Sequence, residues 1–236
     1  MKQPGTQQVK LTQPQAVDAT SMLLWTPTSD STRDCALVLG HSAGSGLAER
    51  TLVALAGGLA DRGLVTATFA FGYRAAGRRM PDRVDRLRRA FLDVVNAVMA
   101  RSGTARVVLG GRSMGGRVAS LLAADGHGDG VLALGYPLCT GGRPAPDPRR
   151  TAHWPRITVP VLFVHGDRDR LCPVDDLDTA RREHLRDTAH HAHVVAGADH
   201  GFATRRRDGR TVGEVHAELV EAVDGWLRRT LEGDDG

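Results

Sequence analysis

Ser113 is the residue of this chain whose neighbours best suit it to act as a nucleophile. The run Gly111-Arg112-Ser113-Met114-Gly115 has the Gly-x-Ser-x-Gly spacing of a nucleophile elbow, a sharp turn between a strand and a helix. The flanking glycines leave room for a strained serine. Amides at the start of the following helix would stabilise an anion formed there. A glycine-rich turn of another α/β fold is the competing interpretation, and the strand and helix on either side favour the elbow.

An activated serine also needs a base and an acid that orients the base. Asp199-His200 follows the last predicted strand, and Gly166-Asp167-Arg168-Asp169 follows the strand before it. Loops at the carboxyl ends of parallel strands meet at one edge of a sheet. We therefore expect a catalytic triad of Ser113, His200 and Asp169. Asp167 is the alternative acid, but its place at the strand end suits it better to bracing the turn.

Other histidines fit other roles better. His41 follows a buried strand and is expected to brace the adjacent glycine-rich loop, while His165 at the end of its own strand is expected to be structural. His153 lies in an irregular stretch and is expected at the pocket rim. His191 and His193 share one strand face, but no carboxylates accompany them at metal-ligand spacing, so we expect no metal site.

The oxyanion hole is expected to consist of two backbone amides. One belongs to Met114, directly after the serine, and the other to the first glycine-rich loop. Within His41-Ser42-Ala43-Gly44 we name Ala43 as that donor, with Gly44 as the alternative.

Five side chains are candidates for the substrate pocket. Tyr73, Tyr136 and Leu138 follow predicted strands and are expected to form a mixed apolar wall with hydroxyl groups at its rim. Trp154 and Leu171 are also candidates, but ordinary core or surface positions suit these two better.

The elements needed to position this site alternate along the chain. Continuous apolar runs predict buried parallel strands, and apolar residues at helical spacing predict the helices between them. The pattern indicates an α/β fold with a mostly parallel central sheet and helices on both faces. We expect one domain over 1–236, with edge strands in 1–34 and an irregular excursion over 139–156 in place of a large lid. Strands are predicted at 8–12, 21–25, 35–40, 64–71, 107–110, 130–134, 159–164 and 191–195, and the first two are expected to form an antiparallel hairpin. Helices are predicted at 47–62, 81–100 and 174–185, from the elbow to 124, and after 211. The last of these helices opens with Thr211-x-x-Glu214, which forms a capping box.

Composition narrows the function classes. The 236 residues are 41% hydrophobic and 25% charged, with a formal net charge of +4, as in a globular protein. Arginines are scattered among acidic residues, so we expect no nucleic-acid partner. Three widely spaced cysteines predict a cytoplasmic protein. The polar start predicts no signal peptide, and without a long apolar run no membrane span is expected. No dinucleotide or Walker motif is present, so no cofactor is expected. Whether the protein forms a homodimer stays open.

The chain resembles the α/β-hydrolase superfamily over nearly its whole length. The runs Gly111–Ser120, Gly135-Tyr136-Pro137-Leu138 and Ala198-Asp199-His200 look like the hydrolase-like family that includes bacterial predicted hydrolases, the Tex-type protein and a chromatin-complex subunit, with dienelactone-hydrolase-like proteins as close relatives. The resemblance supports the same three triad residues.

Two positions depart from the pattern of that family. It usually has glycine where this chain has Ser42, and a serine there shifts the oxyanion donor if the backbone needs a positive φ. It also tends to have proline where Gly72 precedes Tyr73.

The expected activity is hydrolysis of a small ester or thioester-like acyl substrate through an acyl-enzyme on Ser113. Two alternatives stay open: a non-catalytic interaction module that keeps the fold, and an acyltransferase that uses the same triad.

Overall fold

The computed structural model describes residues 22–27, 32–140 and 145–232. A seven-stranded sheet forms its centre, in the order β1-β3-β2-β4-β5-β6-β7. β1 pairs with β3 in antiparallel fashion, and every other pairing is parallel. The strands are β1 (Met22–Trp25), β2 (Cys35–Gly40), β3 (Val65–Phe69), β4 (Arg106–Arg112), β5 (Gly130–Leu134), β6 (Val161–Gly166) and β7 (His190–Val195).

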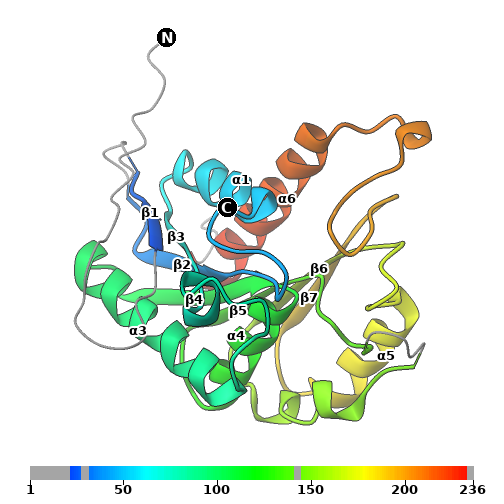
Figure 1. Ribbon diagram of the computed structural model, residues 1–236, viewed down its shortest axis with the longest axis horizontal. Helices are drawn as coiled ribbons and strands as arrows, with labels where there is room; N and C mark the ends of the chain where they lie inside the picture. Colours follow the sequence, from blue (N-terminus) through cyan, green and yellow to red (C-terminus); the bar gives the residue numbers. More distant parts are fainter. Residues whose placement is uncertain (1–21, 28–31, 141–144, 233–236) are drawn as a thin grey trace.

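Helices cover both faces of the sheet (Figure 1). The α-helices are α1 (Arg50–Ala60), α2 (Gly72–Ala75), α3 (Val84–Ser102), α4 (Met114–Ala124), α5 (Val174–His184) and α6 (Val212–Leu227), and short 3-10 or π turns occupy Pro148–Arg150, Trp154–Arg156, Arg206–Asp208 and Arg228–Glu232. The predicted α/β architecture, mostly parallel and covered on both faces, is therefore confirmed.

The two faces carry separate apolar cores. On one face α1 packs against α6 and the sheet, with Leu52, Leu55 and Leu59 of α1 buried. Arg33 and Arg62 both contact Asp224 of α6, at 2.5 and 3.2 Å. α3, α4 and α5 contribute to the core on the other face.

Most predicted elements occur close to their expected bounds, and the differences have local reasons. β6 begins at Val161 because Pro160 has no N–H to donate to the sheet. Pro81 does not open a helix as expected, because α3 begins at Val84. It ends at Ser102 and is capped by Gly103, whose φ of 68° is left-handed. The Thr211–Glu214 capping box is present in both directions.

Only one half of the predicted edge hairpin can be compared with the structure. β1 is an edge strand, as expected, but its partner is β3. The other candidate strand, at 8–12, lies outside the described residues.

The described part of the excursion over 139–156 is anchored by aromatic side chains. Trp154 is fully buried, with its ring 5.1 Å from that of Tyr136 and 5.0 Å from that of Phe163. The Tyr136 hydroxyl donates to the Arg150 carbonyl at 2.6 Å and accepts from the Trp154 indole at 3.3 Å. The excursion is thus packed onto the loop after β5 and does not project from the body.

His153 adds a polar attachment between the excursion and α4. Its Nε2 lies 2.8 Å from the Ser120 hydroxyl, and both side chains are buried. The expectation that His153 lies at a pocket rim is therefore wrong, because the aromatic anchors draw this segment into the interior.

Sheet topology places the site. β2 lies between β3 and β4, so the chain departs from β2 in opposite directions along the sheet. Such a switch point leaves a crevice at the carboxyl ends of the strands. The glycine-rich loop after β2 and the elbow after β4 face each other there.

Candidate active site

Ser113 occupies a strained turn between β4 and α4. Its φ of 51° and ψ of −111° lie in a region that side-chain-bearing residues rarely adopt. Its N–H donates to the Leu134 carbonyl at 2.8 Å, and its own carbonyl accepts from Arg117 at 3.0 Å. Such a conformation costs about 1–3 kcal/mol and persists only where the surroundings fix it.

The two glycines of the motif have distinct steric reasons. A side chain on Gly115 would overlap the Gly40 carbonyl, because α4 packs directly on the end of β2. A side chain on Gly111 would meet the same carbonyl, and its φ of 153° is also unfavourable for other residues. The prediction that these glycines supply room for the turn is confirmed.

The structure brings Ser113, His200 and Asp169 together from three loops. The Ser113 hydroxyl lies 2.9 Å from His200 Nε2, and His200 Nδ1 lies 2.7 Å from Asp169 Oδ2. Asp169 is fully buried, and its other oxygen accepts the Leu171 amide at 2.8 Å. The His200 side chain is 25% exposed, and Ser113 is half-buried.

Asp167 is used differently. Its carboxylate accepts the Gly197 amide at 2.9 Å and so ties the turn after β6 to the turn after β7. This is the bracing contact expected for the acid nearer the strand end.

The histidine loop is shaped by its neighbours. Asp199 Oδ1 accepts the amides of Gly201 and Ala203 at 2.8 and 3.0 Å, which closes a tight turn around His200. Phe202 has a φ of 63°, and it and Ser113 are the two non-glycine residues with positive φ in the described chain. Backbone strain is thus concentrated at the two loops that meet at the Ser113–His200 contact.

The loop after β2 is held by Glu49. Its carboxylate accepts the Ser42 amide at 3.1 Å and contacts the hydroxyl of Ser45. The Ser42 amide is therefore already engaged, and the following amide is that of Ala43. Ser42 has no positive φ, so the serine imposes no backbone strain on the loop.

Arg112 connects this loop to the histidine loop. Its guanidinium donates to Glu49, to the Ser42 hydroxyl at 2.9 Å and to the His200 carbonyl at 3.2 Å. Burial lowers the pKa of Arg112, and the negative charges of Asp199 and Asp169 oppose that effect. The sequence analysis did not identify Arg112 and Glu49 as site residues. Arg112 occupies a variable position of the Gly-x-Ser-x-Gly motif, and the motif does not indicate that it contacts Glu49, which lies 63 residues away.

His41 braces the same loop from behind, as expected. Its Nε2 accepts the Phe71 amide at 3.1 Å, so the proton resides on Nδ1, which donates to the Ser42 carbonyl at 2.6 Å. Burial lowers the pKa of His41, which favours this neutral form. The Tyr73 hydroxyl donates to the Ala43 carbonyl at 2.7 Å, so both side chains fix the backbone at Ala43.

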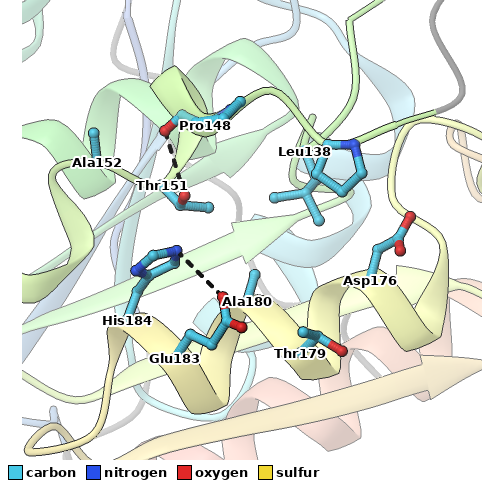
Figure 2. A pocket seen from close by; sticks show the side chains of 10 residues that line it. Leu138, Pro148, Thr151, Ala152, Asp176, Thr179, Ala180, Glu183 and His184 are labelled. Atoms are coloured by element: carbon cyan, nitrogen blue, oxygen red, sulfur yellow. Dashed lines mark hydrogen bonds and ion pairs between the residues drawn. The ribbon is translucent and has the colours of Figure 1, made fainter.

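The candidate pocket residues lie in different surroundings. Tyr73, Tyr136 and Trp154 are buried, with hydroxyl or indole groups bound to protein partners. Leu138 lines a cavity of about 400 Å³ between the excursion and α5 (Figure 2). Leu171 is half-buried. The pocket roles of Tyr73, Tyr136 and Leu138 stay predictions.

Figure 2 shows that this cavity is lined by two opposed segments. Pro148, Thr151 and Ala152 face it from the excursion, and Ala180 and His184 face it from α5. A second cavity of about 510 Å³ is lined by charged residues beside Asp169, among them Arg168 and Arg170.

Among the described residues, no group of three or more histidine, cysteine, aspartate or glutamate side chains is arranged to hold a metal ion. No described helix combines the length and the apolar character needed to cross a membrane.

Fold and site together define the class of protein. The family model for an alpha/beta hydrolase domain matches residues 33–228, which contain every residue of the triad and both loops around it. The chain belongs to this family. No curated protein matches it.

Solved structures share this fold at low sequence identity. An alpha-beta serine hydrolase homologue from Coxiella burnetii is 19% identical, with a TM-score of 0.72 over 94% of this chain and 100% of that one. Est1E from Butyrivibrio proteoclasticus is 16% identical, with a TM-score of 0.68 over 88% and 94%. Dienelactone hydrolase from Anabaena variabilis is 17% identical, with a TM-score of 0.65 over 98% and 100%.

Proposed function

We propose that the protein is a serine hydrolase that cleaves small esters or thioester-like acyl substrates through an acyl-enzyme on Ser113. The observation that carries the proposal is the continuous hydrogen-bonded array of Ser113, His200 and Asp169, at 2.9 and 2.7 Å. Serine and imidazole at this distance, with the imidazole oriented by a buried carboxylate, are the parts required for nucleophilic acyl transfer.

In the proposed first half-reaction, the Ser113 hydroxyl attacks the acyl carbonyl while His200 Nε2 takes its proton. Asp169 accepts the Nδ1–H of His200 and stabilises the imidazolium. The tetrahedral oxyanion is bound by the amides of Met114 and Ala43. The intermediate then collapses, His200 returns the proton to the departing alcohol or thiol, and the acyl group remains on Ser113.

In the second half-reaction, water attacks the acyl-enzyme. His200 Nε2 takes a proton from the water, and the same two amides bind the second oxyanion. Collapse releases the carboxylic acid, and the proton on His200 returns to Ser113. Each proton that His200 accepts is thus returned within the same half-reaction, and the enzyme regains its starting state.

Two features support the choice of Met114 and Ala43. Met114 is the first residue of α4, where the helix leaves its amide without an internal partner. The Ser42 amide already donates to Glu49, so the next amide along the loop is that of Ala43. The Ala43 carbonyl accepts the Tyr73 hydroxyl, which fixes the backbone at this position. Losing one such donor typically costs about 3 kcal/mol of transition-state stabilisation.

The names of similar structures agree with this class of reaction. They include a serine hydrolase homologue and a dienelactone hydrolase. Est1E also occurs with bound ferulic acid. These structures support acyl chemistry and indicate no particular substrate for this chain.

The test compares the wild type with Ser113→Ala on p-nitrophenyl esters of increasing acyl length. We expect the wild type to cleave the short esters and the variant to lose at least about a thousandfold in kcat. Ser120→Ala is the matched control, because Ser120 also contacts a histidine at 2.8 Å but is buried away from the elbow. Equal activity of wild type and Ser113→Ala would refute the assignment.

A fluorophosphonate probe separates the alternatives. Labelling that disappears in Ser113→Ala supports a reactive serine and contradicts a purely structural module. Adding an alcohol to the assay then distinguishes hydrolysis from acyl transfer, because a transferase forms the new ester in preference to the free acid.

A further inference from the structure

The cavity beside Leu138, between the excursion and α5, has the size of a small-molecule site (Figure 2). Its volume of about 400 Å³ falls within the range of about 300–1,000 Å³ that such sites occupy. Apolar side chains form most of its wall, namely Leu138, Pro146, Pro148, Ala152 and Ala180. No residue of the triad is among the described residues that line this cavity, which we call the α5 groove.

Two carboxylates of α5 face the α5 groove without a basic partner. Asp176 and Glu183 both line it, and no arginine or lysine is among its described lining residues. Asp176 has no ion pair or side-chain hydrogen bond with any described residue. Glu183 contacts His184 at 3.9 Å, and this contact is an ion pair only when the imidazole is protonated. The groove therefore carries negative charge that the described residues do not neutralise.

The two carboxylates are spaced by the helix. Asp176 and Glu183 are seven residues apart, close to two turns of α5, so they lie on the same face and about 10 Å apart along its axis. Figure 2 shows Thr179 and Ala180 between them, opposite Leu138. The α5 groove thus has an acidic group toward each end and an apolar wall between.

This arrangement specifies the chemistry of a ligand. Carboxylates bind ammonium groups through charge-assisted hydrogen bonds, and an apolar wall favours a hydrocarbon chain. One metal ion cannot contact both carboxylates, because its oxygen ligands must lie within about 2.6 Å of it. A ligand with a cationic group at each end of an aliphatic chain meets both carboxylates and covers the wall between them.

We propose that the α5 groove is a binding site for aliphatic diamines. Asp176 and Glu183 each bind one ammonium group, and the apolar wall around Leu138 and Ala180 packs against the carbon chain. The whole chain has a formal net charge of +4, so its overall field repels a dication, and binding depends on the local carboxylates. The site does not depend on the proposed hydrolase activity.

The test is calorimetric titration of the full chain with hexamethylenediamine, hexylamine and ethylenediamine. Hexamethylenediamine is expected to bind saturably and about fivefold more tightly than hexylamine, because the second ammonium group gains a half-exposed charged contact. Ethylenediamine carries the same two charges on a chain too short to reach both carboxylates, so it should bind more weakly than hexamethylenediamine. Added salt should weaken the diamine contacts.

Four variants locate the binding. Asp176→Asn and Glu183→Gln should each remove the preference for hexamethylenediamine over hexylamine, because each leaves one carboxylate. Asp175→Asn is the matched control, since it removes the adjacent acid of the same helical turn, which does not line the α5 groove. It should leave the preference unchanged. Ala152→Trp, at an exposed position of the excursion, fills the groove without changing its charge and should abolish binding.

The outcomes separate this site from the proposed function. Absence of saturable binding to the wild type, or equal affinity for hexamethylenediamine and hexylamine, overturns the diamine site. An equal loss in Asp175→Asn and Asp176→Asn also overturns it, because the attraction would then come from the general charge of the helix. Ser113→Ala should bind hexamethylenediamine like the wild type, so a failure of the hydrolase assignment leaves this measurement unaffected.

Discussion

His153 makes the stability of this protein depend on pH in a direction that can be calculated. Its imidazole is buried against Ser120, and burial together with three nearby arginines lowers its pKa from 6.5 to about 4. In the unfolded chain the same group titrates near its ordinary value. Between these two pKa values the unfolded state binds a proton that the folded state does not. The free energy of unfolding therefore falls as pH decreases from about 6.5 to about 4.

The size of the effect follows from the same two values. One pKa unit corresponds to about 1.4 kcal/mol, so a difference of about 2.5 corresponds to about 3 kcal/mol for the full interval. This contribution is fully present above the unfolded pKa and is lost as pH falls toward the folded pKa. His41 and His165 are also buried with lowered pKa values, so the wild type alone does not isolate His153.

The perturbation is His153→Gln, which keeps a hydrogen-bonding group for Ser120 but cannot titrate. Urea unfolding is followed by tryptophan fluorescence between pH 4 and 7.5, with the buried Trp154 close to the altered site. We expect the variant to be less stable than the wild type at pH 7.5, and the gap to close or reverse by about 3 kcal/mol at pH 4. The exposed His191→Gln is the control and should run parallel to the wild type. Parallel curves for wild type and His153→Gln would refute the reasoning.

Three further predictions concern the elements around the site. Arg112→Gln should lower kcat about tenfold or more with little change in KM, because it releases both loops that flank the nucleophile; unchanged kcat in steady-state assays contradicts this role. Gly115→Ala should lose about 3 kcal/mol or more in urea unfolding through its overlap with Gly40, whereas Gly57→Ala in α1, with open space around it, should gain about 0.5–1 kcal/mol. Thr211→Ala should lower the unfolding free energy by about 1 kcal/mol through loss of the capping box, and an unchanged melting curve would show that the cap contributes nothing.

The inner strands β2, β3, β5 and β6 were predictable because they are buried on both faces and therefore read as largely apolar runs. β2 and β5 occur within the expected residues. The helices were predictable from their spacing, but their first turns were less so. α1 begins at Arg50 and not at 47, because the residues before it belong to the loop that Glu49 holds. Such boundaries depend on contacts between distant residues, which periodicity does not contain.

The triad residues could be predicted because acyl chemistry requires these residue types, and a parallel sheet brings the loops after its strands to one edge. The side chains that hold those loops in place could not be predicted. Arg112 occupies the variable position of its motif, and its partners come from the loop after β2 and the loop after β7. His153 was expected at a rim because its segment is rich in proline, glycine and arginine. The buried contacts of Trp154 and Tyr136 outweigh that local composition.

The packing of α6 against α1 has a consequence for synthesis. The two helices cover the same face of the sheet, yet about 150 residues separate the end of α1 from the start of α6. At typical translation speeds of about 5–20 residues per second, roughly eight to thirty seconds pass before synthesis reaches α6. During that interval Leu52, Leu55 and Leu59 lack their cover from α6. We expect this leucine face of α1 to be the surface by which molecular chaperones bind the nascent chain, and its release to coincide with the docking of α6.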